Sequence, residues 1–220
     1  MNLYDDNSKT HWAGATAMAS PSAGAIVLAA GESRRLGSPK ALVQVGAYPL
    51  IWWACHMLKK AGCSPIVVVV NQAILSEANA WLPDTNVVVN PAPELGRTGS
   101  LQCGLKALQE EHAGVERVVM APIDRPGWNA GVVAGLLKHA NSVCVSWNGQ
   151  NGHPVLLHHA ALQQVLSASP STPLRDVVSF APVDLESPHL SLNIDTMEDV
   201  THLMQIETQL LDYFSQGEEI

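Results

Sequence analysis

Short apolar runs alternate with longer amphipathic stretches along the chain from residue 25 onward. Runs of β-branched and small apolar residues predict buried strands near 25–30, 66–70, 87–89, 118–120 and 143–145. The stretches between them predict helices near 49–62, 74–81, 101–111 and 128–140. Alternation at about 20–30 residues per unit is typical of an α/β fold with a mainly parallel sheet and right-handed crossovers.

The alternation changes after residue 146. Residues 147–152, with the sequence WNGQNG, have the Asn-Gly chemistry of a tight hairpin turn, and the apolar stretch 153–157 follows. We therefore predict an antiparallel hairpin insertion near 147–158. Further on, we predict a helix opened by Pro173, a short strand end at 192–195, and a final helix capped by Thr196.

The length of 220 residues is sufficient for one α/β domain with a full core. Residues 1–24 are rich in Ser, Ala, Gly, Thr and Pro without a period, so we expect an N-terminal tail. Residues 25–220 are expected to form a single domain, because the sequence has no internal repeat and no change in composition that would mark a second domain. The predicted architecture has three layers, with helices on both faces of the sheet.

Composition and charge exclude several classes of protein. A net charge of −8 argues against a nucleic-acid-binding surface. No apolar run approaches the ~20 residues that a membrane span needs, and the first residues lead into no apolar signal core, so a cytoplasmic protein is expected. The four cysteines form no C-x-x-C pair and are expected to be reduced, and the nine histidines show no zinc-site spacing.

The stretch from Ala25 to Lys40 carries the most chemical information. Its apolar run ends at Gly31 in a loop that holds Arg34, Arg35 and Lys40. A strand that ends in such a loop brings backbone N–H groups and positive charge to a phosphate. The spacing fits neither a Walker A loop nor the dinucleotide-binding fingerprint. The alternative interpretation is a structural turn with solvated charges.

Three further polar segments follow predicted strands, namely 90–100, Asp124 and Asp195. Because ligands of open α/β sheets bind at the carboxyl ends of the strands, we expect all of these segments to form one site. A carboxylate just past a buried strand suits Mg²⁺, which takes only one or two protein carboxylates. Either Asp could instead cap the following helix, and Asn193 is an alternative oxygen donor to Asp195.

The pattern L-A-A-G-x-S-x-R-x-G-x-P-K at 28–40 resembles the signature of the MobA-like nucleotidyltransferases, with Leu36 in place of the usual Met. The segments PIDRP, GHPVLL, NIDTMEDV and NPAPELGRTGSLQCGL are similar to later motifs of that family, so the resemblance extends over most of residues 25–213. It implies a Rossmann-like nucleotidyltransferase fold. Within the family, LAAG with Pro39-Lys40 looks like the branch of molybdenum cofactor cytidylyltransferases, whereas the guanylyl branch usually has LAGG. A G-D-x-G-A-R element common in the cytidylyl branch is replaced by residues 171–176, and this departure bears on the acceptor rather than on the nucleotidyl chemistry.

The resemblance implies transfer of a nucleoside monophosphate from a triphosphate, CTP in this branch, to a phosphorylated acceptor such as molybdopterin, with release of pyrophosphate. Its implied catalytic residues are Arg35, Lys40 and Asp124, and its implied Mg²⁺ ligands are Asp124 and Asp195. The implied nucleotide-binding residues are Leu28, Ala29, Ala30, Gly31, Ser33, Arg35, Lys40 and Ser100.

Two alternatives to this function remain. The first is the same chemistry with GTP or with another acceptor, such as a sugar phosphate or phospholactate. The second is a nucleotide-binding maturation module without turnover, which a chain with Arg35, Lys40 and Asp124 all present disfavours. Transient contact with a molybdoenzyme or its chaperone is also implied by the resemblance.

Overall fold

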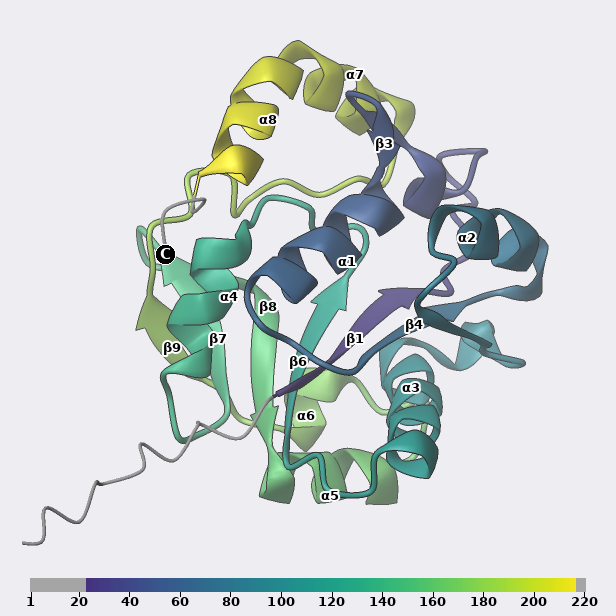
Figure 1. Cartoon of the computed structure of the whole chain (residues 1–220), viewed down its shortest axis with the longest axis vertical. Coiled ribbons are helices and arrows are strands. Elements are labelled where there is room, and N and C mark those ends of the chain that lie inside the picture. The colour runs from purple at the N-terminus through teal and green to yellow at the C-terminus, as the bar shows by residue number, and fades with distance from the viewer. Residues whose placement is uncertain (1–22, 217–220) are drawn as a thin grey trace, which may run out of the picture.

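The computed structural model describes residues 23–216. Its centre is a seven-stranded sheet with the order β5-β4-β1-β6-β8-β7-β9 (Figure 1). The strands of this sheet are β1 (Gly24–Ala29), β4 (Ile66–Val70), β5 (Asn86–Val89), β6 (Arg117–Pro122), β7 (Val143–Trp147), β8 (Gln150–His158) and β9 (Ala181–Asp184). A separate two-stranded hairpin consists of β2 (Gln44–Val45) and β3 (Tyr48–Pro49).

Helices pack on both faces of the sheet, which gives the predicted three layers (Figure 1). One layer contains α1 (Leu50–Lys60), α2 (Leu75–Trp81), α4 (Ala130–Leu137), α7 (Met197–Gln205) and α8 (Glu207–Ser215). The other contains α3 (Arg97–Glu111), α5 (His159–Ser167) and α6 (Leu174–Val177). Short 3₁₀ turns are η1 (Lys40–Leu42), η2 (Gln72–Ile74) and η3 (Pro93–Leu95). None of the helices within residues 23–216 is both long and apolar enough to cross a bilayer.

Side chains of β1 alternate between the two layers, as the pleat of a strand requires. Ala25 and Val27 pack in the core under α1 and α4, whereas Ile26 and Leu28 pack under α3 and α5. All four residues are buried, which explains why the strand is apolar at every position rather than at alternate positions.

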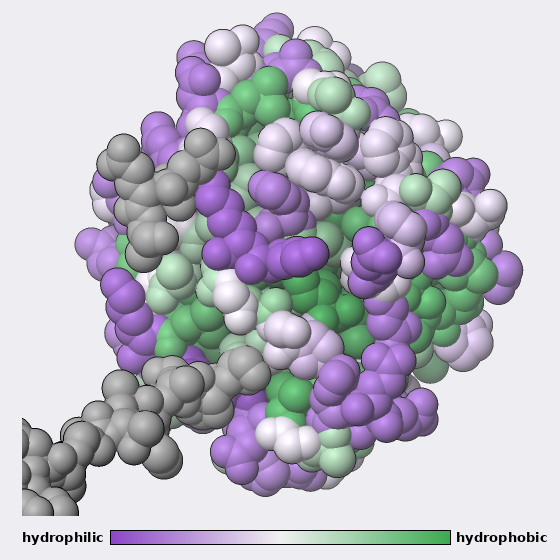
Figure 2. Space-filling model, in the orientation of Figure 1, coloured by the Kyte–Doolittle hydropathy of each residue, from purple (hydrophilic) through white to green (hydrophobic). Residues whose placement is uncertain are grey.

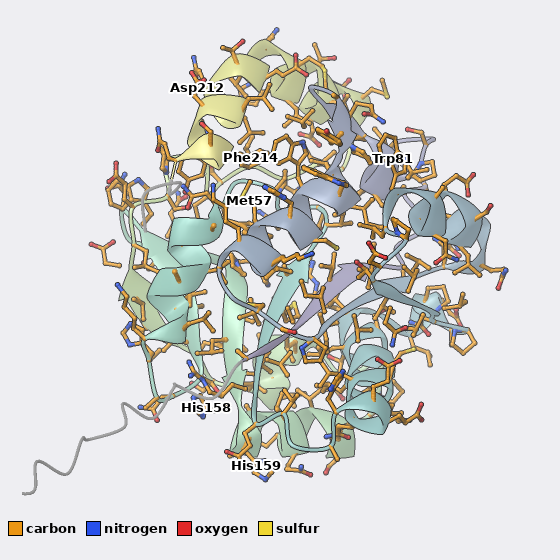
Figure 3. All side chains as sticks on the ribbon, in the orientation of Figure 1. Met57, Trp81, His158, His159, Asp212 and Phe214 are labelled. Atoms are coloured by element: carbon orange, nitrogen blue, oxygen red, sulfur yellow. The ribbon has the colours of Figure 1, made fainter. Side chains whose placement is uncertain are left out.

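The aromatic residues of the first layer serve mainly in packing. Trp53 donates its indole N–H to the carbonyl of Val45 at 2.9 Å, and its ring lies 4.9 Å from that of Phe214. Phe214 and Met57 are both buried where α8 meets α1 (Figure 3). On the same face, the space-filling view shows apolar and hydrophilic residues interspersed over the helices (Figure 2).

The predicted hairpin insertion is confirmed. β8 is antiparallel to both β6 and β7, whereas β1 pairs in parallel with β4 and β6. The turn between β7 and β8 has positive φ at Asn148 (51°) and Gly149 (77°), as a two-residue hairpin turn of the mirror-image type requires. The sheet is therefore mainly parallel, with one antiparallel strand inserted.

Several elements differ from the sequence predictions. The strand end predicted at 192–195 is wrong, because this stretch forms no ladder and is joined to the end of β6 by the Ile194 N–H and Asp124 carbonyl at 2.9 Å. Helix α3 begins at Arg97, four residues before the predicted start at 101. The elements β2, β3, β9 and α5 were not predicted. The N-terminal tail was predicted for residues 1–24. Residues 1–22 lie outside the described residues, and Gly24 belongs to β1 rather than to a tail.

All four cysteines are free thiols. Burial raises the pKa of both Cys55 and Cys63 to about 12, so these thiols stay protonated and inert at neutral pH. The adjacent pair His158 and His159 lies at the end of β8, opposite the start of β6, and is visible at the lower end of the sheet in Figure 3. Within the described residues, no group of three or more His, Cys, Asp or Glu side chains could hold a metal.

The chain order of the strands reverses beside β1. The chain proceeds from β1 to β4 and β5 on one side and then returns to place β6 on the other. Such a switch point is where open α/β sheets bind ligands. The Ile123 N–H donates to the Leu28 carbonyl at 3.0 Å, and Ile194 bonds to Asp124, so three segments lie side by side at the carboxyl ends of β1 and β6.

We expect Gly127→Ala to lower the free energy of unfolding by about 3 kcal/mol or more, as overpacking against backbone does. A Cβ on Gly127 would lie 1.7 Å from the carbonyl oxygen of His189, and neither backbone can easily move. The matched control is Gly114→Ala, where a Cβ meets no heavy atom within 4 Å. Urea unfolding measures both variants, and equal stabilities would contradict the prediction.

Candidate functional site

The loop after β1, residues 31–40, is held in one conformation by Ser33. The φ angle of Ser33 is 51°. The Ser33 carbonyl accepts hydrogen bonds from the N–H groups of Leu36 and Gly37 at 3.0 Å each, and Ser33 Oγ accepts one from the Lys40 N–H at 3.1 Å. Leu36 is buried and anchors the loop on the core. These contacts fix the start of η1, and therefore the position from which the Lys40 side chain extends.

Two cations of this loop meet the carboxylate of Asp195, which lies 155 residues after Lys40 in the chain. Lys40 Nζ forms an ion pair with Asp195 Oδ1, and Arg35 Nη2 lies 3.3 Å from Oδ2. Asn193 Nδ2 also donates to Oδ2, at 2.9 Å. The hydrogen bonds from Lys40 and Asn193, together with the two positive charges, lower the pKa of Asp195 to about 2. The carboxylate is therefore ionised at any physiological pH.

The second carboxylate, Asp124, has a different partner. Arg97 Nη2, at the start of α3, lies 3.5 Å from Asp124 Oδ2. The two carboxylates thus come from segments joined by the Ile194–Asp124 backbone hydrogen bond, and each is paired with its own cation or cations.

Neither carboxylate caps a helix, which was the alternative role left open by the sequence. Thr196 caps α7 and forms a capping box with Asp199, and Asn129 caps α4 by accepting the N–H of Val132. Asp124 and Asp195 are therefore engaged by cationic side chains and not by a helix N-terminus.

The oxygen donors at this point fit a hard divalent cation. Besides the two carboxylates, the Oδ1 atom of Asn193 is buried without a hydrogen-bond partner. The Asn193 amide turns its Nδ2 toward Asp195, so a rotation of the amide would present this oxygen on the side of the carboxylate. Mg²⁺ completes its shell with water and substrate phosphates rather than with protein alone. The chemistry of these donors fits the predicted ion, whereas the binding of the ion itself remains a prediction.

Two adjoining cavities contain all the predicted site residues. The β1–β6 cavity, of about 240 Å³, is lined by residues that include Leu28, Ala29, Ala30, Gly31, Ser33, Lys40, Ser100 and Asp124. The loop cavity, of about 430 Å³, shares Gly31, Ser33, Lys40 and Pro93 with it and adds Arg35 and Asp195. The structure thus brings together the side chains that the sequence singled out, while their roles remain predictions.

A buried hydrogen-bond network stabilises the wall of the β1–β6 cavity. One of its members, Asn90, was not among the predicted site residues. Asn90 accepts the Ala92 N–H at 2.9 Å and donates to Ser100 Oγ at 3.0 Å, which in turn donates to the Gly96 carbonyl at 3.2 Å. Ser100 is therefore at least a structural residue of the 90–100 segment. An Asn directly after a strand and before a Pro was the available signal.

A third cavity, of about 710 Å³, adjoins the β1–β6 cavity, and we call it the Phe180 cavity. Its lining includes Arg97, His153, Leu174, Arg175 and Phe180, together with the 171–173 segment. Burial and the charges of Arg97 and Arg125 lower the pKa of His153 to about 4, so its ring is neutral at pH 7. Residues 171–175, from the segment that departs from the family resemblance, line this cavity.

A parallel sheet with a cationic loop and two carboxylates at its switch point defines an α/β domain of the nucleotidyltransferase class. The chain belongs to the MobA-like NTP transferase domain family, whose sequence model matches residues 25–186. The predicted family and fold class are thereby confirmed.

Two curated relatives are molybdenum cofactor guanylyltransferases. The protein of Xanthomonas euvesicatoria pv. vesicatoria is 28% identical over 142 residues, which cover 64% of this chain and 68% of the relative. The protein of Sinorhizobium fredii is 27% identical over 136 residues, or 60% of each chain, so less than two thirds of that relative is spanned. Both names differ from the cytidylyl branch that the LAAG motif favoured.

Solved structures show the same fold at low identity. Rv0371c from Mycobacterium tuberculosis H37Rv superposes with a TM-score of 0.72 at 22% identity, covering 86% of this chain and 100% of that chain. A structure of Rv0371c in complex with manganese gives a TM-score of 0.67 at 19% identity, covering 84% and 98%.

Proposed function

We propose that the chain transfers the nucleoside monophosphate of GTP to the phosphate of molybdopterin and releases pyrophosphate. The family and the two guanylyltransferase relatives support this proposal. The observation that carries it is the meeting of Arg35 and Lys40 with Asp195, beside Asp124, around adjoining cavities. A cationic loop facing two carboxylates suits a triphosphate that arrives with a divalent ion.

In this mechanism Lys40 and Arg35 bind the β- and γ-phosphates. They stabilise the negative charge that grows on the departing pyrophosphate, which is the main catalytic demand of such transfers. The backbone of residues 29–31 lies against the base, where small side chains permit close approach. The nucleophile is an oxygen of the acceptor phosphate, which is already anionic and needs no general base.

The transfer exchanges one phosphoanhydride bond for another. The acceptor oxygen forms a bond to the α-phosphorus as the bond from that phosphorus to the β-phosphate oxygen breaks. The electron pair of the broken bond leaves with pyrophosphate. The acceptor occupies the Phe180 cavity, from which its phosphate reaches the β1–β6 cavity.

We also propose Mg²⁺ as the ion held by Asp124 and Asp195, with Asn193 as the additional oxygen donor. When bound, Mg²⁺ would neutralise phosphate charge and polarise the α-phosphate. As the phosphates engage Lys40 and Arg35, Asp195 loses its cationic partners and becomes free to take the ion. The manganese complex of Rv0371c supports a divalent ion in this fold.

CTP is the second candidate donor, and Ala30 favours it. This buried residue lines the β1–β6 cavity, and its methyl group stands where the guanylyl branch usually has Gly. Because Ala30 also packs in the core under α3 and α5, the support for CTP is the resemblance of LAAG to the cytidylyl branch. The competition between the two donors is therefore part of the test.

The test is pyrophosphate release from GTP, CTP or ATP in the presence of Mg²⁺ and molybdopterin. We expect GTP to give the highest rate, with no release when molybdopterin is omitted. A faster rate with CTP would replace the proposed donor by the second candidate. The protein could instead release no pyrophosphate with any triphosphate, although a triphosphate raises its melting temperature. That result would reject the proposed transferase and favour a nucleotide-binding maturation module without turnover.

We expect Arg35→Gln to weaken the binding of Mg²⁺-GTP by about tenfold, the loss typical of one charge-assisted hydrogen bond. The matched control is Arg34→Gln, because Arg34 is 81% exposed and pairs with Glu32 rather than with Asp195. We expect less than about threefold weakening for that variant. Isothermal titration calorimetry measures both affinities, and equal losses would contradict the assignment of Arg35.

Two further features belong to the proposal. We place the protein in the cytoplasm, on the composition of the sequence. From the family resemblance, we expect its product to pass to a molybdoenzyme or its chaperone by transient contact. Both remain predictions.

A further inference from the structure

We propose that Arg97 binds the phosphate of the acceptor and releases Asp124 as it does so. This inference rests on the proposed function and deepens it, because it names the residue that receives the nucleophile. Arg97 is the first residue of α3 and the partner of Asp124. The family resemblance assigns it no role.

The position of Arg97 is fixed by its neighbours. It follows Gly96, whose φ of 98° lies in a region that favours glycine. Thr98 Oγ1 donates to the Thr172 carbonyl at 2.6 Å, and the Gly99 N–H donates to the Pro170 carbonyl at 3.0 Å. The first turn of α3 is thus tied to the segment that forms the wall of the Phe180 cavity.

Arg97 stands at the junction of two cavities. It lines the β1–β6 cavity together with Asp124 and the Phe180 cavity together with His153 and Phe180. A phosphorylated molecule seated in the Phe180 cavity must present its phosphate at this junction to reach a nucleotide in the β1–β6 cavity. The guanidinium of Arg97 is therefore in place to receive it.

The Arg97–Asp124 contact is weak enough to exchange. Arg97 Nη2 lies 3.5 Å from Asp124 Oδ2, and the Arg97 side chain is 42% exposed. Ion pairs of this kind contribute little in water, whereas a phosphate dianion offers a guanidinium two parallel charge-assisted hydrogen bonds. His153, neutral at pH 7, adds no competing charge beside it.

Exchange of partners predicts two opposite effects of removing Arg97. A phosphate monoester loses its cation and binds more weakly. Asp124 loses a competing positive charge, so a divalent ion binds more tightly to the nucleotide-free protein. A residue that only held Asp124 in place would change ion binding and leave the binding of the phosphate monoester unchanged.

The experiment compares the wild type with Arg97→Gln, Arg97→Lys and the control Lys106→Gln, an exposed cation on the same helix. Phenyl phosphate is titrated by ³¹P NMR without metal, with saturating tripolyphosphate to fill the cationic loop. Mn²⁺ binding is measured separately by electron paramagnetic resonance without either phosphate compound. Circular dichroism shows whether each variant is folded.

We expect Arg97→Gln to weaken phenyl phosphate binding by at least tenfold and Arg97→Lys by about threefold, since Lys retains the positive charge but not the two parallel N–H donors of the guanidinium. Mn²⁺ should bind at least threefold more tightly to Arg97→Gln, and Lys106→Gln should match the wild type. Unchanged phenyl phosphate binding by folded Arg97→Gln would overturn the inference, as would unchanged Mn²⁺ affinity. Neither titration requires turnover, so failure of pyrophosphate release would reject the proposed function and leave this result standing.

Discussion

Lys40→Ala is expected to lower the rate of nucleotidyl transfer by about 10³-fold while the protein stays folded. Lys40 Nζ pairs with Asp195, and its side chain is only 16% exposed, so its charge acts in a partly desolvated place. Removing one such preorganised charge commonly costs 10²–10³-fold when it stabilises the transition state. The contact that Lys40 makes with Ser33 uses its backbone N–H, which Ala retains. The measurement is pyrophosphate release at saturating GTP and molybdopterin.

The control for this variant is Lys59→Ala, which removes an exposed cation of α1 that lines none of the three cavities described above. We expect Lys59→Ala to have the wild-type rate and the wild-type stability in urea. Lys40→Ala should stay folded in buffer but unfold at a lower urea concentration, because Asp195 loses the hydrogen bond that does most to lower its pKa. A normal rate of pyrophosphate release by folded Lys40→Ala would refute the role of Lys40.

Asp124→Asn is the second variant with a large expected effect, again about 10³-fold in rate, or roughly 4 kcal/mol of transition-state stabilisation. The amide is isosteric with the carboxylate but carries no charge for a divalent ion. Because Lys40 and Arg35 still meet Asp195, we expect the affinity for GTP to change far less than the turnover number. Steady-state kinetics at a series of Mg²⁺ concentrations separate the two effects.

The matched control is Asp84→Asn in an exposed turn after α2, which should leave both constants unchanged. A turnover number for Asp124→Asn within tenfold of the wild type, at saturating Mg²⁺, is incompatible with Asp124 as a ligand of the catalytic ion.

The parts of the fold that could be predicted are those whose pattern is local. The β1 and β4 runs are buried on both faces, and the Asn148-Gly149 turn requires positive φ that few other pairs accept. β9 escaped prediction because it is a mostly exposed strand with Pro182 inside it, paired only with β7. Leu192 and Ile194 are buried, as alternate residues of a strand can be, but burial alone does not show that a stretch pairs in a sheet.

The sequence predicts where the candidate site lies, at the carboxyl ends of the strands, but not how its side chains pair. Because Asp124 follows β6 and the cationic loop follows β1, their proximity follows from parallel strands. The pairing of Arg97 with Asp124 and the orphaned Oδ1 of Asn193 depend on how loops cross that edge, which no sequence spacing encodes. Likewise, only the fold shows that the unusual segment 171–176 lies at the Phe180 cavity.

The central claim is that the cationic loop and the two carboxylates act on one triphosphate at its α-phosphorus. The most direct measurement incubates the wild-type protein with molybdopterin, Mg²⁺ and GTP labelled with ³²P at either the α- or the γ-phosphate. We predict that the α-label appears in the molybdopterin product and the γ-label in pyrophosphate. Transfer of the γ-label to molybdopterin, or its release as inorganic phosphate, would contradict the account.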